Sequence, residues 1–560
     1  MDGDGKILRI GRTGRAPAQP RRPPRTGQID GLPLDRALDA PPLYAQIRDR
    51  VRSAVLTGAL VPGMRLPPER ELAATLGVNR TTTMRAYQEL AADGVVVARP
   101  GRGTLVCAPE GGSGAGGGRE RTVGGSTDGH GDAGGTWPAR DLSAAWLLGL
   151  HPIGQNLGPD PSLLRDALAL AARDDVISFA AGAPLGEALA FEAVREALTA
   201  VMDLSGAGAL AYGPVEGLAS LRRAIAARMA RRGTHVATPE VLVLSSATQG
   251  LALAARALLE PGDEVVVEAP TYVGVLQTFG AAGLRLIGVP LDREGIRVDM
   301  LAPILARRRV RLIVVQPTLH NPTGISMSPD RRERLVSLAR RHGVPILEDL
   351  TYAELWDNGA EPLSLLALDR DGLVLHLGSF AKTIAPGLRV GWVAGPAPAI
   401  ARLALAKQCA DLNTGALPQL AVERMLESGA YDCHLTRVRA LYAARRGVLS
   451  AALRGAGAGL ELPADPGGGL YLWCRVPGGR GRHLAAEAIK AGVAVLFGEA
   501  FYSAQTIGGE DGVDRIRLSV AGVGAEKIAE GVGRLLPILE RQHRTRRSTE
   551  APNNGLRPVI

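Results

Sequence analysis

The hydrophobic pattern divides the chain into two folded bodies with a glycine-rich stretch between them. Apolar residues at helical spacing begin near Pro41, and a strand-like hairpin closes this first body at Val106. From about residue 140 to 540, short apolar runs typical of buried strands alternate with helical periods. This alternation indicates an α/β domain with a mainly parallel sheet.

The polar stretches around these bodies predict the domain boundaries. Residues 1–37 carry arginines among prolines and glycines without a hydrophobic period, so we expect a disordered basic arm. The first folded domain spans 38–107, and the glycines of 108–138 predict a flexible linker. The second domain spans 139–541, and 542–560 forms a polar tail.

The smaller domain contains a helix-turn-helix pattern. A first helix is predicted from Leu43 to Val55, where apolar residues recur at helical spacing. The turn Gly77–Val78 follows a second helical segment, and Asn79 is a favourable N-cap for a helix over 80–92. We expect the recognition helix of the motif to be this last one.

The helix over 80–92 has an apolar face and a basic face. Met84, Tyr87 and Leu90 are predicted to face inward, because they recur every three residues. Arg80, Thr81 and Arg85 fall on the opposite side. A basic outward face of this kind is the arrangement that enters the major groove of DNA.

A hairpin follows this helix. Its strands are predicted over 95–98 and 104–106, and its glycine-rich tip carries Arg99 and Arg102. Such a wing suits a minor groove or a phosphate backbone. The alternative interpretation is a three-helix interaction domain whose arginines merely solvate its surface.

Composition and charge narrow the class of protein. At 560 residues, 46% of them hydrophobic, the chain is long enough for at least two domains. No apolar run of about 18 residues is uninterrupted and the N-terminus lacks an apolar signal region, so we expect neither a membrane span nor secretion. The net charge of +9 favours a polyanionic partner. The cysteines show no metal spacing and fit a reducing cytoplasm: Cys107, Cys409, Cys433 and Cys474.

From Pro41 to Val106 the chain resembles the winged-helix domain of the GntR family of bacterial regulators. Pro68 departs from the family pattern, because a serine cap is more usual there. The resemblance implies binding to double-stranded DNA through a set of exposed side chains: Arg70, Arg80, Thr81, Arg85 and, in the wing, Arg102.

In the larger domain, the most informative stretch follows a predicted buried strand over 373–377. A small-residue turn there presents Lys382, and Arg389 follows seven positions later. A lysine amine can form a Schiff base with an aldehyde, which is what pyridoxal 5'-phosphate (PLP) requires of its protein. Ser379 and Arg389 are suited to hold its phosphate.

Two further strands end in groups suited to the same cofactor. The strand over 241–244 leads into a helix whose first turn, with Ala247 and Thr248, offers backbone N–H groups to a phosphate. The strand over 344–347 leads to Asp349, a carboxylate that can keep a pyridine nitrogen protonated.

The remaining candidates lie near these strand ends. Asn321 and Tyr352 can hydrogen-bond a ring hydroxyl, and Tyr272 can stack on an aromatic ring. Arg517 is a candidate bidentate clamp for an α-carboxylate. Each has an ordinary alternative: a generic Asn-Pro-Thr-Gly turn for Asn321, a helix cap for Asp349 and a surface ion pair for Arg517. Their order along the chain, between strands, favours a common site.

Over nearly all of 150–540 the chain resembles fold-type I aminotransferases. The resemblance implies a large domain with a mainly parallel sheet, a small α+β domain, and Lys382 as the Schiff-base lysine. It also implies a homodimer in which Tyr212 reaches the neighbour's phosphate. Two departures stand out: Ser246 replaces the usual glycine of the phosphate turn, and the loop 182–185 lacks a commonly seen acidic residue. The implied contacts are Asp349, Asn321 and Tyr352 on the ring, Ala247, Thr248, Ser379 and Arg389 on the phosphate, and Arg517 on the substrate carboxylate.

The winged helix, the linker and the aminotransferase-like body together resemble the MocR group of GntR regulators. That resemblance implies a body that senses PLP, or its adduct with an amine or amino acid, and so biases how a dimer presents its two heads to DNA. Two alternatives stay open. One is a working PLP-dependent aminotransferase that acts on amino acids with 2-oxo acids, and the other is a cofactor-binding scaffold that only reports vitamin B6 supply.

Overall fold

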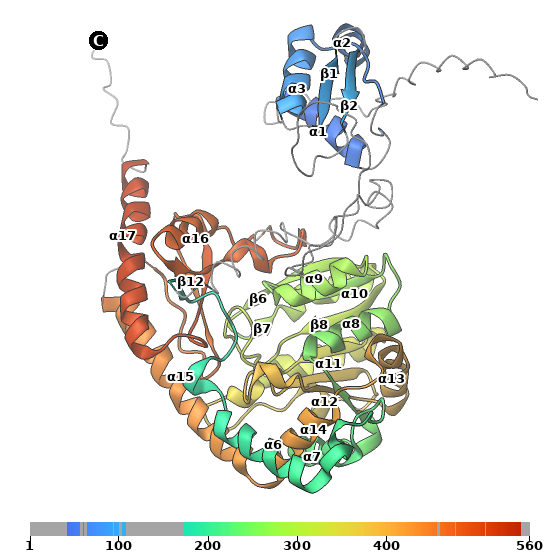
Figure 1. Ribbon diagram of the computed structural model, residues 1–560, viewed down its shortest axis with the longest axis vertical. Coiled ribbons are helices and arrows are strands. Elements are labelled where there is room, and N and C mark those ends of the chain that lie inside the picture. Colours follow the sequence, from blue (N-terminus) through green and yellow to red (C-terminus); the bar gives the residue numbers. More distant parts are fainter. Residues whose placement is uncertain are drawn as a thin grey trace, which may run out of the picture. The chain divides into compact units, whose positions relative to one another are not determined.

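The computed structural model describes residues 42–56, 60, 64–92, 95–99, 103–107, 173, 175–455, 460–476, 478–509 and 511–549. It divides into two compact units, and each is described by itself (Figure 1). The predicted arm over 1–37 and linker over 108–138 lie outside the described residues. At the other end, the last helix runs to Thr549, past the predicted domain end at residue 541.

The smaller unit is a helix-turn-helix followed by an antiparallel hairpin. The three helices and the hairpin share one apolar core. This core includes Ile47 of the first helix, Leu72 of the second, Tyr87 of the third and Val96 of the hairpin. The elements are α1 (Leu43–Leu56), α2 (Glu69–Leu76), α3 (Arg80–Ala92), β1 (Val96–Arg99) and β2 (Gly103–Val106).

The turn between α2 and α3 is as the sequence predicts. Gly77 has a φ of 62°, in the left-handed region that favours glycine, and closes α2. The Asn79 side-chain oxygen accepts a hydrogen bond from Thr81 N at 3.2 Å, which confirms the N-cap of α3. Pro68 takes the N-cap position of α2 without a side-chain hydrogen bond.

The prediction that Met84 faces inward is wrong. Its side chain is 36% exposed, whereas Thr83 and Ala86 are fully buried. The reason is the helical period of 3.6 residues: Tyr87 and Leu90 share a face with 83 and 86, while 84 lies at the edge of that face.

The larger unit is built on a nine-stranded, mainly parallel sheet, which confirms the predicted fold class. Only β11 and the short β7 run antiparallel to their neighbours. In spatial order the strands are β15 (Gln505–Thr506), β6 (Arg285–Asp292), β5 (Glu264–Ala269), β8 (Val310–Val315), β9 (Ile346–Asp349), β10 (Val374–Ser379), β11 (Gly391–Ala394) and β4 (Val241–Leu244), with β7 (Gly295–Ile296) beside β6.

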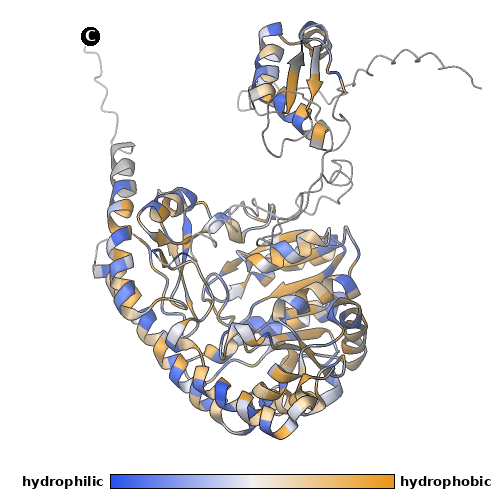
Figure 2. Cartoon of the chain, viewed as in Figure 1, coloured by the Kyte–Doolittle hydropathy of each residue, from blue (hydrophilic) through white to orange (hydrophobic). Residues whose placement is uncertain are grey.

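Helices cover both faces of this sheet because its strands are apolar on both sides. Val265 and Val267 of β5 pack into one cluster and Val266 into the other, as the two-residue period of a strand requires. Accordingly, the strands are largely hydrophobic throughout (Figure 2). The first cluster includes α8 (Ala247–Leu258), α9 (Val273–Ala281) and α13 (Ala397–Asp411), and the second α10 (Val298–Arg307), α11 (Pro329–His342) and α12 (Leu365–Leu368).

A smaller α+β subdomain follows the sheet in the sequence. Its three-stranded antiparallel sheet consists of β12 (Tyr471–Arg475), β16 (Arg515–Ser519) and β14 (Leu496–Phe497). A separate parallel pair joins β3 (Ile177–Ser178) to β13 (Val493–Ala494). The other elements are α6 (Phe191–Ser205), α7 (Ala219–Arg231), α14 (Ala416–Glu427), α15 (Ala430–Gly455), α16 (Gly481–Lys490), α17 (Ala525–Thr549), and the 3-10 turns η1 (Gly186–Ala188), η2 (Gly206–Leu210), η3 (Thr238–Glu240), η4 (Ala353–Leu355), η5 (Pro386–Leu388) and η6 (Gly498–Phe501).

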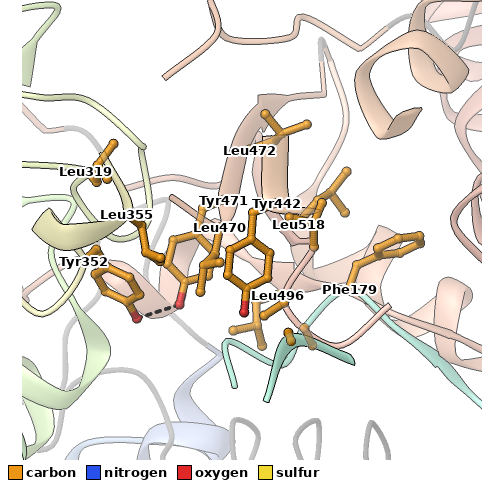
Figure 3. Packing of buried hydrophobic residues seen from close by; sticks show 14 of the residues in the cluster. Phe179, Leu319, Tyr352, Leu355, Tyr442, Leu470, Tyr471, Leu472, Leu496 and Leu518 are labelled. Atoms are coloured by element: carbon orange, nitrogen blue, oxygen red, sulfur yellow. Dashed lines mark hydrogen bonds between the residues drawn. The ribbon is translucent and has the colours of Figure 1, made fainter. Parts of the chain in front are cut away.

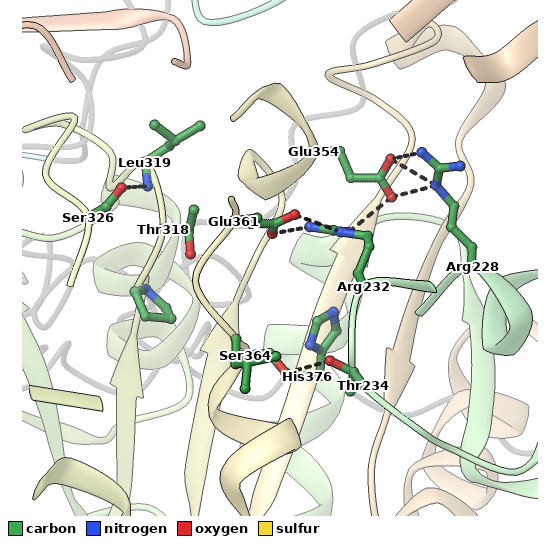
Figure 4. A network of polar contacts seen from close by, with 12 residues as sticks. Arg228, Arg232, Thr234, Thr318, Leu319, Ser326, Glu354, Glu361, Ser364 and His376 are labelled. Carbon is green, nitrogen blue, oxygen red and sulfur yellow. Dashed lines mark hydrogen bonds and ion pairs between the residues drawn. The ribbon is translucent and has the colours of Figure 1, made fainter. Parts of the chain in front are cut away.

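A buried ion-pair network fixes η4, which follows β9, against α7 and α15 (Figure 4). The Glu354 carboxylate accepts hydrogen bonds from Arg228 at 2.6–2.9 Å and from Arg232 at 3.1 Å. Tyr431 of α15 also donates to it, at 2.7 Å. Burial opposes ionisation of Glu354, but the two guanidinium groups outweigh it and lower its pKa to about 2.

We predict that Glu354→Gln lowers the free energy of unfolding by about 3–5 kcal/mol at pH 7, because it removes the buried carboxylate partner of Arg228 and leaves only the exposed Asp432. The folded-state pKa is depressed, so the wild-type contribution is present above about pH 4.5 and is lost as the pH falls towards 2. Urea unfolding at pH 7 and pH 3 measures both effects. The difference in unfolding free energy between wild type and Glu354→Gln should be smaller at pH 3.

The matched control is Glu192→Gln, which removes an exposed ion pair with Arg195 and should cost less than about 1 kcal/mol. Equal stability of Glu354→Gln and wild type at pH 7 would contradict the assignment.

Candidate functional site

The candidate residues of the larger unit meet at one edge of the sheet. Strands β8, β9 and β10 are parallel, so the segments that follow them come together where the strands end. Asn321 and Lys382 stand on the segments that follow β8 and β10, and Asp349 is the last residue of β9. This carboxyl edge is where open α/β sheets bind ligands.

Lys382 is half-buried at this edge, and its Nζ donates a hydrogen bond to the Gly182 carbonyl at 2.9 Å. Burial and then the positive charge of Arg517 lower the pKa of Lys382 to about 8, while Asp349 acts in the opposite direction and Arg389 lowers it slightly. The structure therefore brings Lys382, Arg517, Asp349 and Arg389 within electrostatic range of one another.

Asp349 is buried and held by three donors. Its Oδ1 accepts from Thr351 N at 3.0 Å and from Thr351 Oγ1 at 2.6 Å. Its Oδ2 accepts from Gln316 Nε2 at 2.7 Å. The alternative interpretation of Asp349 as a helix cap does not hold. Its carboxylate accepts hydrogen bonds from the Gln316 side chain and from Thr351 in the turn after β9, not from the first turn of a helix.

Arg517 reaches the same region from β16 of the small subdomain. Its Nη1 donates to Asn321 Oδ1 at 2.8 Å and its Nη2 to the Ala180 carbonyl at 2.6 Å. The guanidinium carbon lies 4.4 Å from the centroid of the Tyr471 ring. Its Nε is buried and has no hydrogen-bond partner among the described residues. Arg517 is therefore a buried cation with an unused donor, and the alternative of a surface ion pair does not hold.

Tyr352 and Tyr471 point their hydroxyl groups at each other beside Leu319 and Leu355 (Figure 3). The two oxygens are 2.7 Å apart and the rings meet edge to face at 5.4 Å between centroids. Burial raises the pKa of Tyr352 well above its usual value, so it remains a neutral hydroxyl. Sequence reasoning missed Tyr471. Its hydroxyl also lies close to the loop that contains Gly182, where a Cβ would be only 2.3 Å from it.

The first turn of α8 forms a potential phosphate cradle. Ser246, which replaces the expected glycine, is its N-cap and accepts from Gln249 N at 3.0 Å. The N–H groups of Ala247 and Thr248 precede the first intrahelical hydrogen bond and remain available. Gly391 of β11 packs closely here, since a Cβ on it would lie 3.2 Å from Ala247 N.

The other predicted phosphate residues are Ser379, the last residue of β10, and Arg389, which follows η5. Ser379 is buried, and its Oγ accepts from Ala381 N at 3.2 Å. Arg389 is exposed, with a φ of 54°, and the only hydrogen bond it makes among the described residues is a long one, 3.5 Å, to Pro386 O. A weakly held guanidinium of this kind is free to bind an anion.

The two remaining tyrosines behave differently. Tyr272 is part of the site: burial and then the charge of Asp349 raise its pKa, and its hydroxyl hydrogen-bonds Thr248. Tyr212 is 87% exposed and lines a groove with Asp411 and Asn413.

In the smaller unit, the predicted DNA contacts within the described residues are exposed. Arg70, Arg80, Thr81 and Arg85 lie on α2 and α3. Arg80 Nε is 3.5 Å from Glu69, and the Arg85 guanidinium stacks on the Tyr44 ring at 3.8 Å. Arg102 lies outside the described residues.

Two other kinds of site are absent from the described part of the chain. No helix there is long and apolar enough to cross a membrane. No group of three or more His, Cys, Asp or Glu side chains there could hold a metal ion. Cys409, Cys433 and Cys474 form no disulfide with any residue in the described part of the chain.

The residues present fit PLP. Lys382, with its lowered pKa, suits the aldehyde, and the Asp349 carboxylate suits the pyridine nitrogen. The N–H groups at the start of α8 suit the phosphate. The unsatisfied Nε of Arg517 suits a substrate carboxylate. Residues 174–535 match the family model of class I and II aminotransferases, and residues 43–106 that of bacterial regulatory proteins of the gntR family.

The chain belongs to the MocR-type regulators of the GntR family. It is 30% identical to the probable rhizopine catabolism regulatory protein MocR of Rhizobium meliloti, over 76% of this chain and 79% of that protein. It is 35% identical to aromatic-amino-acid aminotransferase 1 of Thermococcus litoralis, over 69% of this chain and 93% of that protein.

The solved structures include the α-aminoadipate aminotransferase LysN of Thermus thermophilus, complexed with N-(5'-phosphopyridoxyl)-L-leucine. LysN is 32% identical, with a TM-score of 0.65, over 71% of this chain and 99% of LysN. The aminotransferase domain of this MocR-type chain is accordingly a PLP domain of fold type I.

We predict that PLP uptake by the cofactor-free protein accelerates with pH, with a midpoint near pH 8 and a plateau above about pH 9, because only the neutral Lys382 amine attacks an aldehyde. Arg517→Gln removes a nearby positive charge, so the pKa of Lys382 should rise and the midpoint should move to higher pH. Stopped-flow absorbance measures the rate.

Arg515→Gln is the matched control, since Arg515 lies on the same strand but is 3.5 Å from Asp514. Its midpoint should stay near pH 8. A wild-type midpoint above pH 10 that is unaffected by Arg517→Gln would show that Lys382 is not in this environment.

Proposed function

We propose that the protein is a DNA-binding transcriptional regulator that senses PLP, together with an amine or amino acid, through its aminotransferase-like domain. The observation that carries the proposal is the presence, in one chain, of an exposed basic α3 and of residues suited to each group of PLP. Such a regulator acts where the bacterial chromosome is, in the cytoplasm.

The smaller unit supports the DNA-binding half of the proposal. Arg80 and Arg85 are 54% and 60% exposed, and their carboxylate neighbours lie 3.5 and 3.6 Å away. Surface pairs this long contribute little, so both arginines can exchange them for phosphates or base edges at small cost. We assign the major-groove contacts to Arg80, Thr81 and Arg85, with Arg70 on α2 and Arg102 in the wing contacting the DNA beside them.

In the larger unit, each residue has a distinct part in holding the cofactor and an effector. PLP supplies an aldehyde that captures amines and a protonated ring that withdraws electrons. Asp349 accepts the ring N–H, and Asn321 and Tyr352 bind the ring hydroxyl. Tyr272 packs against the ring. The phosphate is held by Ala247, Thr248, Ser379 and Arg389.

Arg517 is placed to hold the α-carboxylate of an amino-acid effector. Two of its N–H groups are engaged by Asn321 and Ala180, which orient the guanidinium, while Nε is unsatisfied. An incoming carboxylate would therefore satisfy a buried donor, which makes its binding favourable. A ligand that binds one arrangement of the domain more tightly shifts the population towards it, and this is how the signal would reach the heads.

The partner of the larger unit is proposed to be a second copy of the chain. Leu204, Leu210 and Tyr212, on α6, on η2 and just beyond it, are 76%, 67% and 87% exposed. Asp411, beside Tyr212 in the same groove, accepts from Gln249 of α8 at 2.6 Å, so the groove adjoins the phosphate cradle. A homodimer would cover these apolar side chains and bring Tyr212 of one copy to the phosphate of the other. Light scattering tests this, and a monomeric mass at micromolar concentration would exclude it.

A second candidate function is catalysis by the same site. The observation in its favour is the pKa of Lys382, near 8, which leaves about a tenth of the amine neutral at pH 7 and able to accept a proton from a bound amino acid. The two functions are compatible, and steady conversion of an amino acid to its 2-oxo acid without any DNA binding would favour the enzyme alone.

We predict that Arg80→Ala combined with Arg85→Ala weakens binding to operator DNA about 30-fold or more, because each lost base or phosphate contact contributes about 1–3 kcal/mol. The absorbance of bound PLP should not change, since these residues belong to a separate unit. Fluorescence anisotropy at fixed salt measures the affinity.

The charge-matched control is Arg195→Ala with Arg297→Ala, two exposed arginines of the larger unit that pair with neighbouring acids. It should leave DNA affinity within about twofold. If the α3 double variant binds DNA as tightly as wild type, the head does not use α3 for recognition and the DNA-binding proposal fails.

A further inference from the structure

Gln316 is the first residue after β8, and none of the proposed contacts with PLP or with an effector is assigned to it. Its side chain is only 2% exposed, in a region where Asn321 and Asp349 also lie. A buried amide must find partners for both its donor and its acceptor, because leaving either unpaired is costly. The partners of the Gln316 amide therefore show which groups it holds in place.

Both ends of the Gln316 amide are engaged by residues of the cofactor site. Its Nε2 donates to Asp349 Oδ2 at 2.7 Å, and its Oε1 accepts from Asn321 N at 3.0 Å. Its backbone N–H donates to the buried Glu268 carboxylate at 2.7 Å, which anchors the residue to β5. Gln316 thus forms a bridge between the segments that follow β8 and β9.

The bridge fixes how the Asp349 carboxylate is turned. Both hydrogen bonds from Thr351 go to Oδ1, and within the described residues only Gln316 donates to Oδ2. A rotation of the carboxylate would break all three hydrogen bonds at once. Oδ2 retains acceptor capacity beyond this single donor, and a ring N–H would use it.

The other end of the bridge leads to the carboxylate clamp. Asn321, whose backbone N–H is bound by Gln316, accepts from Arg517 Nη1 through its side-chain Oδ1 at 2.8 Å. A continuous chain of hydrogen bonds therefore runs from Asp349 through Gln316 and Asn321 to Arg517.

We propose that Gln316 is a positioning residue that sets Asp349 and Asn321 in the single arrangement needed to bind PLP, and through Asn321 sets the orientation of Arg517 towards an effector carboxylate. The inference rests on the proposed PLP binding and goes beyond it, because Gln316 itself touches neither ligand. The amide is suited to this position because it donates to a carboxylate and accepts from a backbone N–H at the same time.

The main test is Gln316→Met, which keeps the length of the side chain and removes both hydrogen bonds. We expect the dissociation constant for PLP to rise about tenfold or more, because hydrogen bonds to charged groups are the stronger ones. With PLP saturating, the affinity for an amino acid should also fall, while that for the matching amine without a carboxylate should change less. Absorbance titrations measure all three.

Gln419→Met is the matched control. Gln419 is also fully buried, with Oε1 accepting from Leu218 N at 2.8 Å and Nε2 donating to Thr414 O at 2.7 Å, but it binds no residue assigned to the cofactor. The control reports the general cost of losing a buried amide. It should lower thermal stability about as much as Gln316→Met and leave the affinity for PLP unchanged.

Gln316→Glu separates positioning from packing. Its carboxyl can still accept from Asn321 N, but beside Asp349 it must carry a proton in order to donate. The affinity of this variant for PLP should be close to that of wild type at acidic pH and fall as the pH rises and the two carboxylates repel. Gln316→Met should lack this extra pH dependence.

The outcomes distinguish the inference from the proposed function. If wild type binds PLP and Gln316→Met binds it equally well, the positioning role is overturned while the proposed function stands. If Gln419→Met loses as much PLP affinity as Gln316→Met, the effect is one of general stability and the inference is again overturned. If wild type does not bind PLP, both fail.

Discussion

The parallel alignment of β8, β9 and β10 is the constraint on which the rest of the site depends. Because these strands run the same way, Gln316, Asp349 and Lys382 emerge at one edge of the sheet, although they are distant in the sequence. Burial at that edge makes each polar group rely on the others. The lowered pKa of Lys382 and the three donors on Asp349 are two results of that confinement.

The site is tied to the helices behind it through polar contacts. Thr383, next to Lys382, bonds Tyr431 at 2.9 Å, and Tyr431 in turn bonds Glu354. Tyr431 stands at the start of α15, which packs on α17 of the small subdomain. Hydrogen bonds therefore link the residue beside Lys382 to α15, which contacts both α6 and α17. Such connections are what a sensor requires, and they are equally compatible with an enzyme that closes on its substrate.

Much of the site was predictable because its residues stand beside strong local patterns. Lys382, Asp349 and Asn321 each follow an apolar strand, so their position at one edge could be inferred from the parallel sheet. Arg517 was identified from the sequence as a candidate. The sequence did not predict that its Nε lacks a hydrogen-bond partner or that its guanidinium stacks on Tyr471. Gln316 and Tyr471 were missed because their roles arise from contacts between segments far apart in the sequence, which no local pattern encodes. Met84 was placed wrongly because a spacing of three residues drifts off one face of a helix. The role of Tyr212 stays a prediction, because it rests on a proposed second copy of the chain.

The most direct test of the central claim is the affinity of the purified protein for the DNA upstream of its own gene, measured with and without PLP and with a panel of amino acids and amines. The account predicts specific binding that changes several-fold on adding PLP or PLP with one amine, and a Lys382→Ala variant that binds DNA but no longer responds. Binding that is unaffected by cofactor and amine in wild type, or an unaltered response in Lys382→Ala, would contradict it.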